Sequence, residues 1–418
     1  MRILFVTQFF QPEPFFRGVP FAKGLRERGH QVEVLTGFPN YPGGRVYDGY
    51  SIRPVQRETI DGIPVLRVPL YPSHDRSSLH RAMNYLSFGS SAAALGTALV
   101  GPADIAYAYH PPITTGFAAL ALRLTRRIPY VYDIQDLWPD ALATTGMVPG
   151  RLLGAIDAGC RLVYRQAARI SVLSPGFKRS LVARGIEASK IEVIYNWCDE
   201  EALAGPPPSA ELAKNEGLAG RFNVVFAGNM GSAQALGSVL DAAELLLHEL
   251  PDVQFVLMGD GVERGDLQAS ALERRLSNVR FLEYRPQAEA GQILRLADAL
   301  LVHLRDGPLF DVTIPSKTQA YMAQGKPIIM AVRGDAADLV ERAGAGVACA
   351  PQAPMDLAEA VRKMHGLGAE ERNAIGRRAR QYYQDVLSMN VGIDRFVRLF
   401  SEVVEARTPD GHHQTQRN

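Results

Sequence analysis

The sequence predicts an α/β protein built from two doubly wound domains, and three observations carry this prediction. First, a chain of 418 residues is too long for a single hydrophobic core. Second, strand-like apolar runs alternate with helical patterns in both halves, which is typical of a parallel sheet covered by helices on both faces. Third, Gly205–Pro208 cannot continue a regular element and separates the two halves. We therefore expect domains at residues 1–203 and 204–390.

The first domain is expected to open on a buried strand. Its first residues carry one positive charge and only a short apolar run before Gln8 and Pro12, which indicates a strand and not a signal peptide. A helical pattern follows over Val19–Arg28 and ends at Gly29. The strands predicted for this domain are Arg2–Thr7, Gln31–Gly37, Ile63–Val68, Asp104–Tyr109, Ile128–Ile134, Ala168–Ser174 and Lys190–Asn196.

The second domain repeats this alternation after the linker. Helices are expected over Leu236–Glu249, from Ser316 and from Asp335. The polar residues 406–418 are expected to be disordered. The strands predicted here are Phe222–Gly228, Val253–Gly259, Val279–Arg285, Asp298–Leu304, Lys326–Val332 and Gly346–Ala350.

The composition favours a soluble cytoplasmic protein. Hydrophobic residues make up 47% and charged residues 21% of the chain, as in ordinary globular proteins. A net charge of +1 argues against non-specific nucleic-acid binding. The three cysteines, Cys160, Cys198 and Cys349, have neither a zinc spacing nor a disulfide pattern, and no apolar run is long enough to span a bilayer.

Ligands of such sheets bind at the carboxyl ends of the strands, so the cleft between the two domains is the expected site. The loop after the first strand is long and contains a single glycine, Gly18, so it is not a dinucleotide-binding fingerprint. It could close over a sugar or its acceptor, or it could be a plain surface loop.

A second group of polar residues follows the strand that ends at Ile134. In the motif "VYDIQDLWPD", Asp133, Gln135 and Asp136 could hold sugar hydroxyls, and Trp138 could supply a flat apolar platform. Alternatively, Asp136 could cap the following helix. The chain has no Asp-x-Asp triplet, and two separate acids are too weak a signal to predict a metal site.

Two glycine-rich turns follow strands of the second domain. The turn with Gly228 and Gly231 could aim backbone N–H groups at a phosphate, although a purely structural turn fits as well. The same alternative holds for Gly259 and Gly261, which flank Asp260.

The segment "TIPSKTQAYMAQGKPII" gives the most specific signal. A proline near the helix start fits the missing donor there, and free N–H groups around Ser316 and Thr318 would form an anion site. Lys317 adds a full positive charge beside them. A departing diphosphate would need such a group, because its developing charge must be stabilised. A solvated lysine at a helix end is the alternative.

The order of motifs resembles the retaining glycosyltransferases of family 4, which have the GT-B fold. The matching motifs are "LRERGHQVEVLTGFPNYP", "DLWPD", "IEVIYNWCD", "FAGNMGSAQAL", "MGDGVER" and "IPSKTQAYMAQGKPII", and they span Arg2 to about Phe400. The resemblance is strongest to the bacterial surface-polysaccharide branch, which includes N-acetyl-L-fucosamine transferases of O-antigen assembly.

This resemblance implies a nucleotide-diphosphate sugar, with UDP favoured, bound mainly by the second domain. It also implies a polyprenyl-diphosphate-linked saccharide acceptor met from the first domain, retention of configuration, no metal or other cofactor, and a last helix at 391–405 that packs back on the first domain. Asp136, Gln135 and Lys317 are then the catalytic candidates. The nucleotide-sugar-binding candidates are Gly228, Asn229, Gly231, Gln234, Gly259, Asp260, Gly261, Tyr284, Arg285, Arg305, Ile314, Pro315, Ser316, Lys317, Thr318 and Gln319. The candidates for the acceptor or sugar loop are Arg17, Gly18, His110, Trp138 and Asn196.

Several family positions are filled differently in this chain. The glutamate that binds ribose hydroxyls in many members corresponds to Ala320, which leaves Gln319 or Asp311 as candidates for that contact. The usual diphosphate-binding Arg and Lys of the second domain correspond to Asn229 and Gln234. The frequent active-site His before "DLWP" is Gln135. Lys317, with Arg305, would then carry more of the phosphate charge.

Two other functions stay open at this point. A sugar-nucleotide epimerase of the same fold would form its product without an acceptor. A non-catalytic nucleotide-sugar-binding subunit of a polysaccharide assembly would bind without turnover.

The segment Ser77–Val100 is too polar to span a membrane, and the first interpretation is a packed helix of the first domain. If its first turns were exposed, Tyr85 and Phe88 with the cations Arg76 and Arg81 would suit the surface of the inner membrane.

Overall fold

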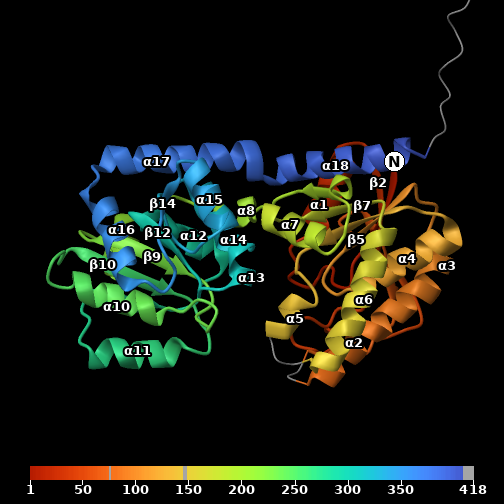
Figure 1. Cartoon of the computed structure of the whole chain (residues 1–418), viewed down its shortest axis with the longest axis horizontal. Coiled ribbons are helices and arrows are strands. Elements are labelled where there is room, and N and C mark those ends of the chain that lie inside the picture. Colours follow the sequence, from red (N-terminus) through yellow and green to blue (C-terminus); the bar gives the residue numbers. More distant parts are fainter. Residues whose placement is uncertain (75–76, 145–147, 408–418) are drawn as a thin grey trace, which may run out of the picture. The chain divides into compact units, whose positions relative to one another are not determined.

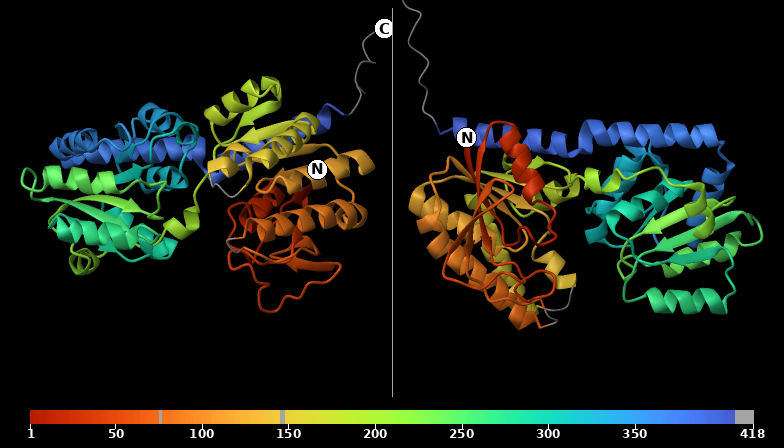
Figure 2. Two further views of the ribbon diagram at one scale, coloured as in Figure 1. Left: turned by 60° about the horizontal axis from the view of Figure 1, so that its bottom comes forward. Right: turned by 180° about the vertical axis from the view of Figure 1, so that it is seen from behind.

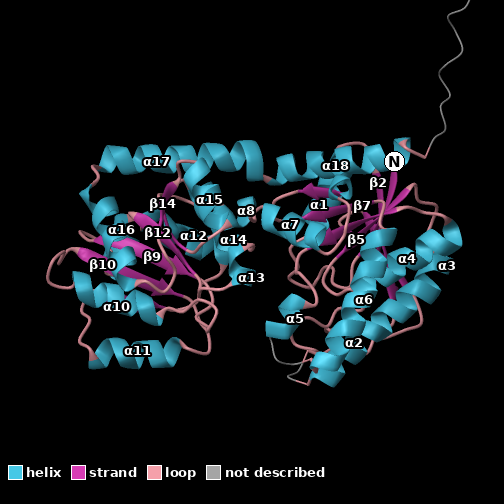
Figure 3. Cartoon of the chain, in the orientation of Figure 1, coloured by secondary structure: helices cyan, strands magenta, loops and turns pink. Residues whose placement is uncertain are grey.

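The computed structural model describes residues 1–74, 77–144 and 148–407. Contacts divide the chain into two compact units. Unit 1 comprises Met1–Leu173, Phe177–Ile194 and Ile393–Asn418, and unit 2 comprises Ser174–Gly176 and Tyr195–Gly392. Both units are α/β, and Figures 1 and 3 show their helices and strands. The predicted architecture of two α/β domains is confirmed, with the change of unit at Tyr195 where 203/204 was expected.

Unit 1 contains an eight-stranded sheet in the order β3-β4-β2-β1-β5-β6-β7-β8. Every neighbouring pair is parallel except β3 and β4, which are antiparallel. The strands are β1 (Arg2–Val6), β2 (Gln31–Gly37), β3 (Gln56–Ile60), β4 (Ile63–Val68), β5 (Ile105–Tyr109), β6 (Tyr130–Ile134), β7 (Arg169–Val172) and β8 (Ile191–Val193). The α-helices are α1 (Val19–Glu27), α2 (Ser78–Ser91), α3 (Thr97–Leu99), α4 (Thr114–Arg126), α5 (Asp140–Thr144), α6 (Gly150–Gln166) and α7 (Pro175–Ala183).

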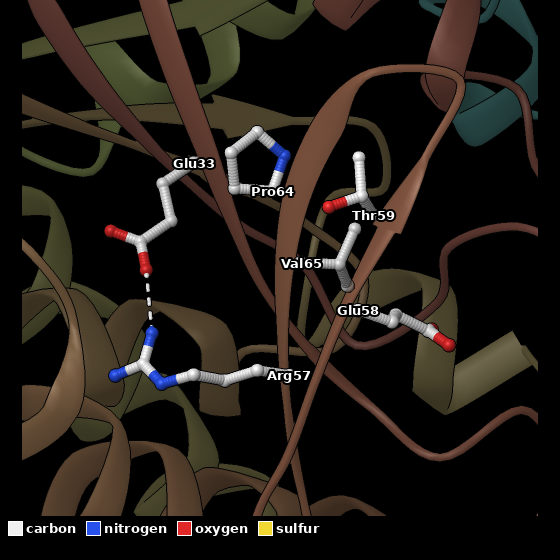
Figure 4. Close-up of a pocket in the computed structure, with 6 residues that line it drawn as sticks. All are labelled: Glu33, Arg57, Glu58, Thr59, Pro64 and Val65. Carbon is white, nitrogen blue, oxygen red and sulfur yellow. Dashed lines mark ion pairs between the residues drawn. The ribbon is translucent and has the colours of Figure 1, made fainter.

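The edge strand β3 was not predicted, because its sequence "QRETI" is mostly charged and polar. Such residues protect a sheet edge from pairing with other chains. Asp61 and Gly62 both have positive φ angles, 50° and 80°, as a two-residue hairpin turn requires. This Asp-Gly pair was the available signal. A pocket of about 250 Å³ lies at this edge, where Glu33 and Arg57 form an ion pair at 3.5 Å (Figure 4).

Unit 2 contains a six-stranded parallel sheet in the order β11-β10-β9-β12-β13-β14. Its strands are β9 (Phe222–Ala227), β10 (Val253–Met258), β11 (Val279–Leu282), β12 (Ala299–His303), β13 (Ile328–Ala331) and β14 (Gly346–Ala348). Its helices are α8 (Glu200–Leu203), α9 (Ala210–Asn215), α10 (Gly237–Leu246), α11 (Arg264–Glu273), α12 (Gln287–Leu296), α13 (Pro308–Asp311), α14 (Ser316–Gln324), α15 (Asp335–Arg342), α16 (Pro354–Gly366) and α17 (Ala369–Tyr382).

Two apolar cores cover the two faces of the unit 2 sheet, as the doubly wound pattern predicts. One contains residues of α12, α14 and α15, and the other contains residues of α10, α11 and α16. Figure 2 shows helices on both faces of this sheet. The proline-rich segment Gly205–Pro208 connects α8 to α9.

The last helix, α18 (Met389–Glu405), follows α17 after a π-helical turn at Tyr383–Leu387. From Ile393 onward its residues belong to unit 1. Within that unit the Phe396 ring lies 5.4 Å from the ring of Phe21 on α1. The predicted disorder of 406–418 concerns mostly residues that lie outside the described part of the chain.

Candidate functional site

The glycine turns after β9 and β10 lock into each other. Gly259 has a φ of 141°, and a Cβ there would lie 2.0 Å from the carbonyl oxygen of Gly228. A Cβ on Gly261 would lie 2.4 Å from the carbonyl oxygen of Met230. The Met230 N–H donates to the Asp260 carbonyl at 2.8 Å. Close backbone approach therefore explains Gly259 and Gly261, as the structural alternative proposed.

Lys317 lies on the first turn of α14, beneath the Gly228 turn. Its Nζ is 3.6 Å from the centroid of the Phe226 ring, and a Cβ on Gly228 would lie 3.3 Å from it. This nitrogen is buried and has no hydrogen-bond partner. Burial lowers the pKa of Lys317 from 10.5 to about 7. The solvated-lysine alternative is therefore wrong, because the ammonium is withdrawn from water.

Two donors beside Lys317 converge on one oxygen atom. The backbone N–H of Gly231 donates to Gln234 Oε1 at 3.1 Å, and Asn229 Nδ2 donates to the same atom at 3.2 Å. An oxygen of a bound anion could replace Oε1 at this point, because it would accept the same two bonds.

The start of α14 differs from the expected anion site in one respect. The Thr318 N–H is not free, because it donates to the Pro315 carbonyl at 2.8 Å in a tight first turn. The Gln319 side chain is buried, and its amide faces the carbonyl oxygens of Pro315 and Ser316 at 3.0 and 3.1 Å. Gln319 is thus engaged within its own helix and is a weaker candidate for the ribose contact.

The other candidates of unit 2 divide into engaged and exposed side chains. Arg285 forms an ion pair with Glu216 at 2.5 Å, which reduces its value as a phosphate ligand. Tyr284 is 70% exposed. Arg305 is exposed, and its backbone N–H donates to the carbonyl of Ala233 at 2.9 Å. Ile314 is buried, and it belongs to the core beneath α14.

In unit 1, Asp133 is the centre of a buried polar network. It accepts hydrogen bonds from Tyr107 at 2.6 Å, Ser171 at 2.8 Å and Gln135 at 3.0 Å. Arg17 Nε lies 3.0 Å from its carboxylate, and both side chains are fully buried. In the structure the Arg17 charge is paired inside the unit, so its predicted contact with the acceptor stays a prediction.

The first loop of unit 1 is anchored through Glu13, and its predicted closure over a sugar or its acceptor stays a prediction. The buried Glu13 carboxylate accepts backbone N–H bonds from Phe10 at 3.0 Å and from Asn40 and Tyr41 at 2.8 Å. Burial raises the pKa of Glu13 to about 7. A Cβ on Gly18 would collide with the Gln11 amide, so this glycine lets Gln11 reach the start of α1.

His110 and Trp138 pack together at the ends of β5 and β6. Their ring centroids are 5.2 Å apart, and Trp138 is only 8% exposed, so it is not an open platform. Neither ring nitrogen of His110 has a hydrogen-bond partner, and burial lowers the pKa of His110 to about 3. The imidazole is therefore neutral at physiological pH.

Asp136 is exposed, whereas Asn196, at the start of unit 2, is half-buried. Protein atoms around the Asp136 carboxyl raise its pKa above the ordinary value by desolvation. Helix α5 begins only at Asp140, so Asp136 does not occupy the capping position that the alternative required.

The structure thus gathers Gly228, Asn229, Gly231, Gln234 and Lys317 in unit 2, and it gathers Gln135 with the Asp133 network in unit 1. Phe226 was not among the residues predicted for the site, although its place two residues before the glycine turn was a signal. Within the described residues there is no group of three or more His, Cys, Asp or Glu side chains that could hold a metal ion. In the same part of the chain, no helix is both long and apolar enough to cross a membrane.

Comparison with known proteins finds glycosyltransferase matches in both halves of the chain. The family model "Glycosyl transferase 4-like domain" matches residues 20–197, and "Glycosyl transferases group 1" matches residues 221–366. The chain is 25% identical to the WbjE protein of Pseudomonas aeruginosa, named as a glycosyltransferase, over 64% of this chain and 68% of WbjE. It is 26% identical to WcaI of Escherichia coli K12, whose name assigns it to colanic acid biosynthesis as a glycosyl transferase, over 72% of this chain and 75% of WcaI.

Among solved structures, HepE of Anabaena in complex with UDP has the same fold, with a TM-score of 0.69 and 18% identity over 96% of this chain and 100% of HepE. Each unit thus has its own glycosyltransferase match, and the fold is that of two-domain GT-B enzymes. The chain belongs to the glycosyltransferases.

Proposed function

We propose that unit 2 binds the diphosphate of a nucleotide-diphosphate sugar, with UDP as the favoured nucleotide. The observation that carries this proposal is the buried Lys317 ammonium, which has no hydrogen-bond partner and lies under the Gly228 turn. A buried cation whose charge faces only an aromatic ring remains unfavourable unless an anion comes to it. The bond to an anomeric carbon would break as negative charge grows on the diphosphate, and Lys317 would stabilise that charge. HepE was solved with UDP, which supports the choice of nucleotide.

The proposed reaction transfers the sugar to an acceptor with retention, so that the acceptor oxygen bonds to the face of the anomeric carbon that the diphosphate leaves. Asp136 and Gln135 of unit 1 would contact the sugar or the acceptor. Asp136 is exposed and Gln135 is half-buried, so both side chains can be reached. We propose that the reaction needs no divalent metal, with Lys317 providing the charge that a metal would supply.

The acceptor would be a lipid-linked or free saccharide in surface polysaccharide or O-antigen synthesis. The name of WcaI, which refers to colanic acid biosynthesis, supports this class. N-acetyl-L-fucosamine or a related hexose is the sugar that the motif resemblance favours. The protein would act in the cytoplasm, where nucleotide sugars are formed.

Peripheral membrane contact would suit a lipid-linked acceptor, and α2 offers a surface for it. Leu79, Met83 and Leu86 are 66, 42 and 60% exposed, and their spacing places them on one side of the helix. The predicted side chains are different: Phe88 is buried and Tyr85 is half-buried, so neither leads such a contact.

The opposite side of α2 is packed, as the first interpretation required. The buried Asn84 donates to the Tyr71 carbonyl at 2.7 Å and accepts from Gln8. No acidic residue occurs in the first turn of α2, which would favour an anionic lipid surface. Arg76 lies outside the described residues.

One experiment tests the whole proposal. Nucleotide sugars are screened for thermal stabilisation, since a ligand at a hundredfold its Kd adds about 2.7 kcal/mol. The stabilising donor is then incubated with and without a lipid-linked saccharide acceptor. Acceptor-dependent product is expected. A changed sugar without acceptor would indicate an epimerase, and binding without turnover on any acceptor would indicate the non-catalytic subunit.

A further inference from the structure

A buried histidine lies directly behind the loop that carries the converging donors. His303 is the last residue of β12 and is 1% exposed. Its Nδ1 lies 2.7 Å from the Gln234 carbonyl oxygen, and its Nε2 lies 3.1 Å from Ser238 Oγ. Gln234 belongs to the segment that links β9 to α10, and Ser238 lies in the first turn of α10.

We propose that His303 is a positioning residue for the loop Asn229–Leu236. By holding the Gln234 backbone, it keeps Asn229 Nδ2 and the Gly231 N–H aimed at one oxygen position. This inference rests on the proposed function, because that position is where we place an oxygen of the diphosphate.

The hydrogen-bond pattern assigns the tautomer of His303. A carbonyl oxygen can only accept, so the proton lies on Nδ1 and is donated to Gln234. Ser238 Oγ donates to the Ala235 carbonyl at 2.8 Å and also lies 3.1 Å from Nε2, so a neutral imidazole with its proton on Nδ1 places Nε2 beside this hydroxyl.

The surroundings of His303 favour this neutral form. Burial lowers its pKa, the hydrogen bond to Gln234 opposes this effect, and the charge of Lys317 on α14 lowers the pKa further. A neutral imidazole adds no second positive charge beside Lys317, so His303 orients the loop without itself attracting the anion.

The loop needs such a support because its backbone is strained. Ala235 has a φ of 46°, a left-handed conformation that side chains with a Cβ adopt at a cost. The Arg305 N–H holds the neighbouring Ala233 carbonyl at 2.9 Å. The contacts that hold the carbonyls of Gln234 and Ala233 therefore come from the end of β12 and the residues just after it. Without His303, the turn would be free to relax at Gln234.

Three substitutions separate the two hydrogen bonds of His303. His303→Asn can keep a donor near the Nδ1 position, whereas His303→Gln places its amide near Nε2 and loses the Nδ1 donor. His303→Leu removes both. His365→Gln is the matched control, because His365 lies on α16 and pairs there with Asp252 at 2.9 Å.

The probes are UDP, inorganic pyrophosphate and uridine, and their Kd values are measured by calorimetry on the full chain. We expect His303→Leu and His303→Gln to raise the Kd values for UDP and pyrophosphate on the order of tenfold, which is the scale for one lost buried hydrogen bond. Uridine binding should not change, and His303→Asn and His365→Gln should match the wild type.

Unchanged UDP affinity in His303→Gln or His303→Leu would overturn the inference. Equal losses for uridine and UDP would also overturn it, because they indicate a general structural role. Circular dichroism and thermal melts verify that each variant folds. If His303→Leu does not fold, the UDP and pyrophosphate affinities of His303→Asn and His303→Gln decide the question. If the wild type binds neither UDP nor pyrophosphate, the proposed diphosphate site is wrong as well. If the wild type binds them and the His303 variants bind them equally well, only the inference about His303 is wrong.

Discussion

Binding of a nucleoside diphosphate should be linked to proton uptake by Lys317. In the free protein the pKa of this buried ammonium is lowered to about 7, so the side chain is mostly neutral at pH 8. A unit negative charge 4 Å away at an effective dielectric of 20 contributes about 4 kcal/mol, which corresponds to about three pKa units. Bound diphosphate would thus return the pKa to about 10, and the lysine would be charged in the complex.

The assay is isothermal titration of UDP at pH 8 in two buffers that differ in ionisation enthalpy. The wild type should take up about one proton per UDP, since about nine-tenths of the lysine is neutral before binding. At pH 6 the lysine is already charged and its uptake should vanish. Lys317→Ala reports the protons that other groups exchange, and Lys317→Arg should show no uptake beyond that background because arginine stays charged.

One result would refute this prediction. It is that the wild type binds UDP tightly at pH 8 but takes up no more protons per UDP than Lys317→Ala does. Turnover gives an independent measurement. Lys317→Ala should lower kcat on the order of a hundredfold, the scale for one lost electrostatic donor. Near-normal turnover in a folded variant would remove Lys317 from the chemistry.

Three further predictions follow from the proposed function. Asp136→Ala should lower transfer while UDP affinity stays within about twofold, and parallel losses of both would contradict a role on the acceptor side. Full activity is expected in excess chelator, and a loss that magnesium restores would reverse the metal-independent proposal. The wild type should float with anionic liposomes at low salt but not at high salt, and the double variant Leu79→Ser/Leu86→Ser should not float at either salt concentration. Equal flotation of both proteins would remove α2 from the membrane proposal.

The regular elements could be predicted because their signals are local. Each predicted strand has a counterpart in the structure, since apolar runs bounded by turns are read from neighbouring residues. The missed strand, β3, is an edge strand whose charged residues do not follow the buried pattern. Its partner β4 was predicted because its mostly apolar run is typical of a strand, and the structure buries all of it except Pro64.

The side-chain partners could not be predicted, because they depend on distant segments. Asp133 was identified near the site, but its contact with Arg17 joins residues 116 positions apart, and only the fold brings them together. In the same way, Lys317 was expected beside an anion site at a helix start, with a solvated lysine as the alternative. The sequence could not show that Phe226 and the Gly228 turn would cover it.

This burial leads to a last prediction, that Lys317 is retained at the expense of stability. The pKa of Lys317 is lowered from 10.5 to about 7. At or below pH 7 this lowers the free energy of unfolding by about 5 kcal/mol relative to a variant with an apolar side chain of similar shape. Between pH 7 and 10.5 the unfolded chain binds more protons than the folded one, so the stability of the wild type should rise with pH in this window. Lys317→Met should therefore have the lowered kcat expected of Lys317→Ala yet be more stable than the wild type, by up to about 5 kcal/mol at pH 7 and about 2 kcal/mol at pH 9. Urea unfolding of both proteins at these two pH values measures the difference. A variant less stable than the wild type at pH 7 would show that the ammonium is already compensated in the free protein, and the case for an anion drawn to it would fail.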